Sequence, residues 1–255
     1  MQMNIIDIKK LYYRLTEEQG YDTKEKNNSE RRKTMDRALE EILSTEKPKL
    51  DHISLSIAFT KEEYAKMLLA AHFNDESLQD WDEILQALGK QGNEPVFEAE
   101  AYYGVLHEKN VLGLITLGKC FDDAIAGFEE AGEILKAYET DYCAMEILKK
   151  SYVIFGDVLY KNEGKYAGAL RFLGEENMKH LPAILERLQV EGVSCNPAFA
   201  LIPQKTVAFM TELSCDKIRE CFHICNDCDR IDCPSRQEEA PMPYGYERIL
   251  GGRKG

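Results

Sequence analysis

The chain has 255 residues, of which 44% are hydrophobic, and a formal net charge of −13 at pH 7. This length suits one large domain, or one domain with an appendage, whose core needs no disulfides. The negative charge argues against a nucleic-acid partner, because proteins that bind the phosphate backbone usually present a basic face.

Neither an export signal nor a membrane span is expected. The first fifteen residues lack a basic segment followed by a long apolar one, and nowhere do eighteen apolar residues run without interruption. The sequence therefore predicts a cytoplasmic protein with no membrane partner. Thiols stay reduced in that compartment, so a tight group of cysteines there is more typical of metal binding than of disulfides.

The first half of the chain predicts helices around one strand. Apolar residues recur at helical spacing over 5–15 and again over 35–43. Residues 52–59 alternate apolar and polar side chains, as a half-buried strand does. Thr60 and Glu63 then have the spacing of a capping box for a following helix. The next helical stripe runs from residue 78 to 88 and should end at Gly89.

The second half predicts a hairpin, long helices and a last strand. Residues 95–106 and 111–118 form an expected antiparallel hairpin around the polar segment 107–110. The pattern is helical from 121 to 159, with a break expected around 138–142. A helix over 178–190 should hold Pro182 in its first turn, and 205–213 alternates as a strand.

Strands and helices do not alternate strictly, so the expected fold class is α+β, with a twisted, largely antiparallel sheet and flanking helices. Three regions are expected: an α+β domain over 1–214, a cysteine-rich metal-binding segment over 215–236, and a tail over 237–255. The tail has the proline and glycine content of a loose terminus.

Four cysteines stand within thirteen positions, as Cys221-x3-Cys225-x2-Cys228-x4-Cys233, and Pro234 follows the last of them. Structural zinc sites usually take two short pairs separated by a dozen or more residues, which is not the pattern here. One continuous loop of thiols resembles the loops of ferredoxin-type proteins that hold a [4Fe–4S] cluster. An iron–sulfur cluster is therefore the favoured ligand, with zinc and unliganded thiols as alternatives, and Cys215 or His223 could substitute as a ligand.

The first three of these cysteines also have the C-x3-C-x2-C spacing of radical S-adenosylmethionine enzymes. Those enzymes place the motif early, before a long barrel, whereas only 27 residues follow Cys228 here. The position of the motif argues against that class.

A second set of motifs lies in the middle of the chain: Thr116-Leu117-Gly118, a helix break at Glu130–Glu133, Gly192-Val193, and Pro203 with Thr206-Val207. In this order they resemble the C-terminal activation domain of vitamin B12-dependent methionine synthase. The opening segment 11–22 and the strand–helix order after Pro48 resemble single-chain relatives of that domain. The similarity covers most of residues 1–213, and it implies the fold of that domain.

The resemblance implies a specific function. In methionine synthase, cobalamin occasionally falls to inactive cob(II)alamin. The activation domain restores it by binding the corrinoid domain and S-adenosylmethionine while an external donor supplies one electron. This chain would be a free-standing reductive activator of a separate corrinoid protein or cobalamin-dependent methyltransferase, and a cluster on its cysteines could deliver the electron.

The chain departs from the family at the methyl-donor site. That site depends on an Arg-x-x-x-Gly-Tyr segment, and the nearest match is Arg171 and Gly174, one residue too close and without the tyrosine. S-adenosylmethionine binding through these two residues therefore stays open. Two other functions remain: a non-catalytic corrinoid-protein adaptor with a structural zinc loop, and a methyltransferase partner or subunit that uses S-adenosylmethionine without redox chemistry. Whether the chain is itself an enzyme is left open.

Overall fold

The computed structural model describes residues 39–40, 43–44, 48–71, 73, 75–168, 170–173 and 177–215. The chain divides into two compact units, Met1–Glu46 and Lys47–Gly255. In the first unit the described residues are helical, as predicted for 35–43, and the helix predicted over 5–15 lies outside the described residues. All the elements that follow belong to the second unit.

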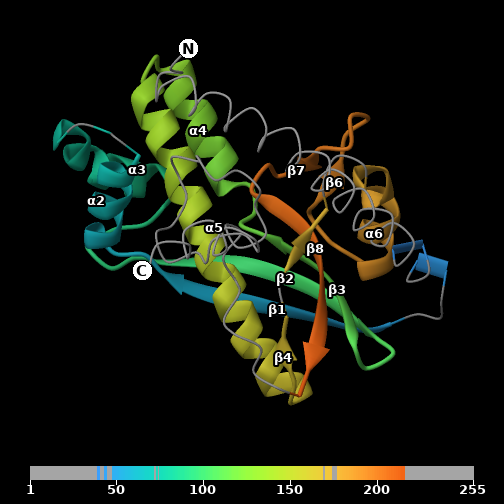
Figure 1. Cartoon of the computed structure of the whole chain (residues 1–255). Coiled ribbons are helices and arrows are strands. Elements are labelled where there is room, and N and C mark those ends of the chain that lie inside the picture. Colours follow the sequence, from blue (N-terminus) through green and yellow to red (C-terminus); the bar gives the residue numbers. More distant parts are fainter. Residues whose placement is uncertain are drawn as a thin grey trace, which may run out of the picture. The chain divides into compact units, whose positions relative to one another are not determined.

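The second unit is built on a curled antiparallel sheet (Figure 1). The strands lie in the order β1, β2, β3, β8 and β4, and β5 also pairs with β8. Every strand pair within the described residues is antiparallel. This confirms the predicted α+β class with a largely antiparallel sheet and flanking helices. The bounds are β1 Lys49–Ala58, β2 Val96–Leu106, β3 Asn110–Thr116, β4 Tyr166–Ala167, β5 Arg171–Phe172 and β8 Thr206–Ser214.

Strand β1 leads into a capped helix, as the sequence predicts. Leu55 and Ile57 of β1 are buried, and the residues that alternate with them, Ser54, Ser56 and Ala58, are exposed. Helix α2, Lys61–Ala70, begins after Thr60. The Glu63 N–H donates to the Thr60 hydroxyl at 3.2 Å, and the Thr60 N–H donates to the Glu63 carboxylate at 2.8 Å. Both halves of the capping box are therefore present.

Helix α3, Trp81–Ala87, ends at the predicted glycine and follows the 3₁₀ turn η1, Asp75–Asp80. Gly89 has a φ of 66°, a conformation that glycine adopts at little energetic cost because it has no Cβ. Its N–H donates to the Gln86 carbonyl at 3.0 Å, and the Lys90 N–H donates to the Leu85 carbonyl at 2.8 Å. This pair of bonds is the Schellman motif, so the sequence itself specifies where α3 stops.

Strands β2 and β3 form the predicted hairpin, in which Leu106 pairs with Asn110. The Lys109 N–H donates to the Leu106 carbonyl at 3.1 Å. The two residues at the tip, His107 and Glu108, have φ values of 51° and 55°. Positive φ at both central positions is the geometry of a type I′ turn. The polar segment therefore makes the turn without the glycine or asparagine that this geometry favours.

The helical region holds two helices, α4 Cys120–Glu130 and α5 Ile134–Glu163. The break predicted around 138–142 is wrong, because those residues lie inside α5. They contain no glycine or proline, and Glu139 and Thr140 are buried against the rest of the unit. The chain instead breaks at 131–133, where Gly132 has a φ of 79°, in agreement with the break expected at Glu130–Glu133. Even α5, with 30 residues, is not apolar enough to cross a membrane, and the same holds for every other helix in the described part of the chain.

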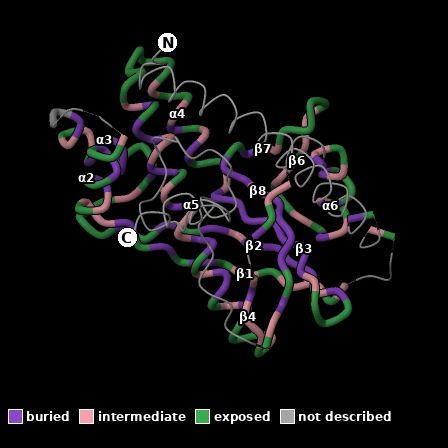
Figure 2. The backbone as a smooth tube through the Cα atoms, in the orientation of Figure 1, coloured by how far each residue is buried: buried purple, intermediate pink, exposed green. Residues whose placement is uncertain are grey.

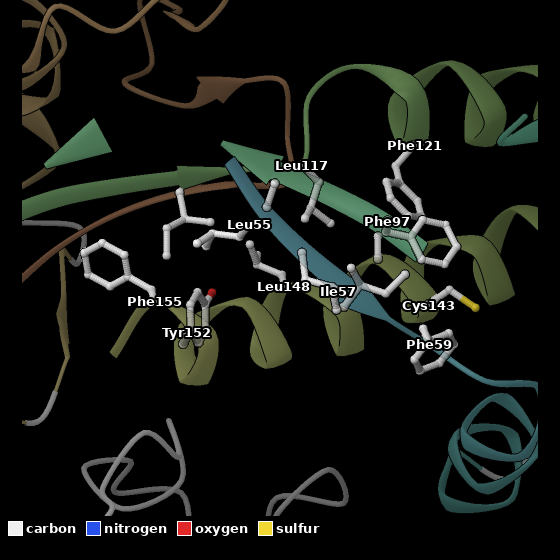
Figure 3. Close-up of a cluster of buried hydrophobic side chains, with 14 of the residues drawn as sticks. Leu55, Ile57, Phe59, Phe97, Leu117, Phe121, Cys143, Leu148, Tyr152 and Phe155 are labelled. Carbon is white, nitrogen blue, oxygen red and sulfur yellow. The ribbon is translucent and has the colours of Figure 1, made fainter. Parts of the chain in front are cut away.

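The main hydrophobic core lies between the sheet and α5. Figure 3 shows Leu148, Tyr152 and Phe155 of α5 facing side chains from the strands. Figure 2 shows buried residues running along the strands and along α5. Each fully buried side chain of this size contributes about 1.5–3 kcal/mol. The core includes Leu55, Ile57, Phe59, Tyr64, Trp81, Phe97, Tyr103, Ile115, Phe121, Cys143, Ile147, Phe155, Leu159 and Phe209.

Helix α6 covers part of the other face of the sheet. It spans Leu181–Leu188, follows the 3₁₀ turn η2 at Met178–His180, and holds Pro182 in its first turn as predicted. The short strands β6, Ser194–Cys195, and β7, Leu201–Ile202, pair beside it. On the inner strands, every second side chain points away from the main core and toward this face. These side chains are buried here together with the apolar residues of α6. They include Tyr102, Leu112, Leu114, Ala208, Met210, Leu181, Ile184 and Leu188.

Candidate functional site

The four cysteines of the predicted metal segment, Cys221, Cys225, Cys228 and Cys233, lie outside the described residues. The structure does show where that segment is attached. Strand β8 ends at Ser214, and Cys215 after it is exposed. β8 is hydrogen-bonded to β3 along one side and to β4 and β5 along the other. The segment therefore follows an interior strand whose position in the sheet is fixed on both sides.

Arg171, predicted as a candidate ligand for S-adenosylmethionine, lies on β5 opposite Met210. Its side chain is 58% exposed and one guanidinium nitrogen lies 3.9 Å from Glu212 Oε1. An exposed pair at this distance contributes little to stability. Its predicted companion Gly174 lies outside the described residues. Arg171 thus has an exposed side chain beside a carboxylate, on the same sheet face as buried Met210.

Two of the motifs behind the family resemblance meet in space. The Thr116 and Thr206 hydroxyls, 90 residues apart in sequence, lie 2.7 Å from each other and are buried. The Gly118 N–H donates to the Thr116 hydroxyl at 3.1 Å, and the Leu117 N–H donates to the Lys205 carbonyl at 3.0 Å. The end of β3 and the start of β8 therefore form one hydrogen-bonded junction, from which α4 begins.

This junction also holds the two long helices. The Lys205 ammonium lies 2.5 Å from Asp141 of α5, and only 9% of the lysine side chain is exposed. The Gln204 N–H donates to Asp122 of α4 at 2.8 Å. The segment that precedes β8 thus contacts both helices through their carboxylates, and the side chains of 122 and 141 are held in place relative to the sheet.

Helix α5 carries a buried acid that was not predicted from the sequence. Glu139 is fully buried, and its Oε2 lies 2.8 Å from the Tyr64 hydroxyl, which is also 3.1 Å from the Ser77 carbonyl. Burial raises the pKa of Glu139, although hydrogen bonds from Ser77 and Tyr64 act in the opposite direction. The hydroxyl has one hydrogen, so it cannot donate both to an ionised Glu139 and to the carbonyl. A proton on Glu139 removes that conflict.

The sequence does indicate this buried acid, through its spacing from the apolar residues of the helix. Glu139 is followed at helical spacing by Cys143 and Ile147, which are both buried. An acidic residue in phase with an apolar stripe indicates a buried carboxyl. The predicted helix break at 138–142 would interrupt this spacing, so the buried carboxyl was not predicted.

No group of three or more His, Cys, Asp or Glu side chains within the described residues is arranged to hold a metal ion. No protein-family model matches the chain, and no curated protein matches it. The resemblance to the methionine synthase activation domain therefore remains a prediction from the sequence motifs.

Proposed function

We propose that the chain is a reductive activator of a cobalamin-dependent methyltransferase such as methionine synthase. In this proposal Cys221, Cys225, Cys228 and Cys233 hold an iron–sulfur cluster of the [4Fe–4S] type. The α+β unit docks on the corrinoid protein. The observation that carries the proposal is the grouping of four thiols within thirteen residues, beginning seven positions after Ser214, where the last strand in the described part of the chain ends.

The donor set fits such a cluster, because four thiolates are the usual ligands of [4Fe–4S] centres. When bound, the cluster accepts and passes on single electrons from an external donor. The chain itself supplies the ligands and limits how far they can lie from the sheet. Cys221 follows Cys215 by six residues, and a fully extended chain of that length spans about 20 Å. The thiols are therefore tethered to the end of β8.

The body of the unit supports the same proposal in a different way. The resemblance rests on short motifs in a fixed order, and two of them form the junction at Thr116 and Thr206. Segments that belong to one structural motif are expected to meet in the folded chain. S-adenosylmethionine as methyl donor is a separate part of the proposal, and Arg171 is its testable residue. Calorimetric titration of the full chain should show heat that Arg171→Ala removes, and a titration without heat at millimolar ligand would dismiss the methyl donor.

A second candidate is a non-catalytic corrinoid-protein adaptor with a structural zinc loop. Four thiolates also complete the tetrahedral shell of Zn²⁺ and leave no open position, which is the pattern of structural zinc sites. Such a loop would stabilise the chain without passing electrons.

Metal and sulfide analysis of anaerobically purified protein distinguishes these candidates. Iron, acid-labile sulfide and broad visible absorbance support the activator, and colourless zinc-loaded protein supports the adaptor. Cys225→Ser should lose the metal and the ability to reduce a corrinoid protein, whereas Cys195→Ser on β6 should keep both. The thermal unfolding of the sheet should be little changed in Cys225→Ser. If that variant unfolds globally, the loop is a structural staple. Freshly prepared protein without iron or zinc would refute both candidates.

A further inference from the structure

A hollow of about 300 Å³ lies between α4 and the first turns of α5. The two helices lie next to each other (Figure 1). Ile125 and Ala126 of α4 and Ala137 of α5 form its apolar lining, and Gln204 also lines it. Ile134 and Tyr138 stand at its rim with more than half of each residue exposed. The hollow is large enough for one or two side chains of another molecule.

The hollow carries negative charge that the described residues only partly neutralise. Three carboxylates line it, those of Asp122, Glu129 and Asp141. Lys205 pairs with Asp141, and neither of the other two takes part in an ion pair within the described residues. One carboxylate oxygen of Asp122 is buried without a hydrogen-bond partner there. A cation entering the hollow would therefore meet two carboxylates that form no ion pair there, although one oxygen of Asp122 already accepts the Gln204 N–H.

The charge favours an organic cation over a metal ion. The carboxylates lining the hollow do not form a group that could hold a metal ion. A guanidinium or ammonium group does not need carboxylates that converge on one point, because it only has to lie within hydrogen-bond distance of them. A guanidinium also stacks on an aromatic ring such as that of Tyr138.

An apolar stripe continues from the hollow along the surface. Ile134, Tyr138, Tyr142 and Met145 follow one another at spacings of four, four and three, so they lie on one side of α5. The ring of Phe73 contacts Tyr138 and Tyr142 with centroid distances of 5.6 and 5.8 Å. Ile134, Tyr138 and Met145 are exposed, whereas Tyr142 and Phe73 are half-buried against the core. Exposed apolar side chains gathered in this way mark a contact surface, and tyrosine is a frequent anchor residue in protein interfaces.

We infer that the hollow and this stripe together bind a segment of a partner protein that carries an arginine or lysine beside an apolar side chain. The cation would lie between Asp122 and Glu129, and the apolar side chain would pack on Ile134 and Tyr138. A small cation would fill the hollow but leave the stripe uncovered. The carboxylates would repel an anionic membrane surface. Complementary charge together with apolar contact therefore selects a protein segment. This inference does not depend on what the thiols bind.

The probe for this surface is the peptide acetyl-Leu-Arg-Leu-amide, titrated into the full chain at millimolar concentrations. Its matched control replaces arginine by citrulline, which has the same shape and no charge. Methyl NMR signals of Ile125 and Ile134 should shift with the arginine peptide, that of buried Ile147 should not, and added salt should weaken the binding. Absence of shifts, or equal shifts with citrulline, would overturn the inference. So would arginine amide alone binding as tightly as the peptide, because a small cation would then suffice.

Two pairs of variants separate this surface from general attraction to an acidic protein. Glu129→Gln should weaken peptide binding about two- to fivefold, as expected for one partly exposed charge pair. Glu130→Gln, a neighbour outside the hollow with the same change in net charge, should leave it nearly unchanged. Ile134→Ser should likewise weaken binding more than Val153→Ser, which lies exposed further along α5. Equal effects within either pair would show that the peptide binds elsewhere.

Discussion

Gly113 in strand β3 has no room for a side chain. A Cβ at this position would lie 2.5 Å from Phe209 Cζ and 2.7 Å from its Cε2, where ordinary carbon contacts are about 3.5–4.0 Å. The Phe209 ring is fully buried and lies edge-on to Phe155 at a centroid distance of 5.3 Å. The ring cannot move away without disturbing the core between the sheet and α5. Gly113→Ala should therefore destabilise the protein.

The magnitude follows from two opposing effects. Overpacking a core by one methyl group costs about 1–3 kcal/mol, and an overlap of this size places Gly113→Ala near the upper end. Replacing glycine by alanine also restricts the unfolded chain, which restores about 0.4–1 kcal/mol. The net loss should be about 2 kcal/mol. For a domain of this length the melting temperature then falls by about 4–8 °C.

The matched control is Gly127→Ala in α4, where an added Cβ meets no atom within 4 Å. Alanine is favoured over glycine in a helix interior by about 0.5–1 kcal/mol, so this variant should melt about 1–4 °C higher than the parent protein. Differential scanning calorimetry measures both variants, and Phe209→Leu combined with Gly113→Ala should cost less than the sum of the two single changes. A melting temperature that rises in Gly113→Ala would refute the packing described between β3 and β8.

Two further changes test local features of the same unit. Thr60→Ala removes one half of the capping box at α2 and should cost about 1 kcal/mol in urea unfolding, with an unchanged m-value; an unaltered midpoint would mean that the cap contributes nothing. Glu139→Gln tests the buried acid. Because its folded pKa is raised, the stabilisation from its proton is complete below the unfolded pKa and is lost as pH rises through the folded pKa. The glutamine variant should gain melting temperature relative to the parent as the buffer changes from acidic to mildly basic, and a gap that shrinks over that range would contradict the assignment.

Local patterns predicted much of the fold, because the forces that define its elements act over a few residues. Three of these patterns depend only on residues a few positions apart in the chain: the alternation in β1, the capping box at Thr60 and the glycine after α3. The order of the family-like motifs places a helix break correctly at 130–133, whereas the helical pattern alone places one at 138–142, where α5 continues. Buried contacts from Glu139 and Thr140 instead keep that segment helical.

The candidate sites divide in the same way. The spacing of four cysteines is visible in the sequence because one continuous segment carries the whole donor set. The hollow between α4 and α5 is not visible there, because it needs residues as distant as Asp122, Tyr138 and Gln204 to meet. Nothing in the local sequence around any one of them indicates that meeting, which depends on how β3 and β8 pair.

The place of β8 in the sheet has a consequence for biosynthesis. The strand made last among those described lies in the interior, between β3 and the short strands β4 and β5. Until residues 206–214 have been synthesised, β3 has an open edge with the apolar sequence Val-Leu-Gly-Leu-Ile, and such an edge readily pairs with other chains. Completion of the sheet must wait for the ribosome to finish this strand. A nascent chain stalled earlier is expected to depend on chaperones to stay unaggregated.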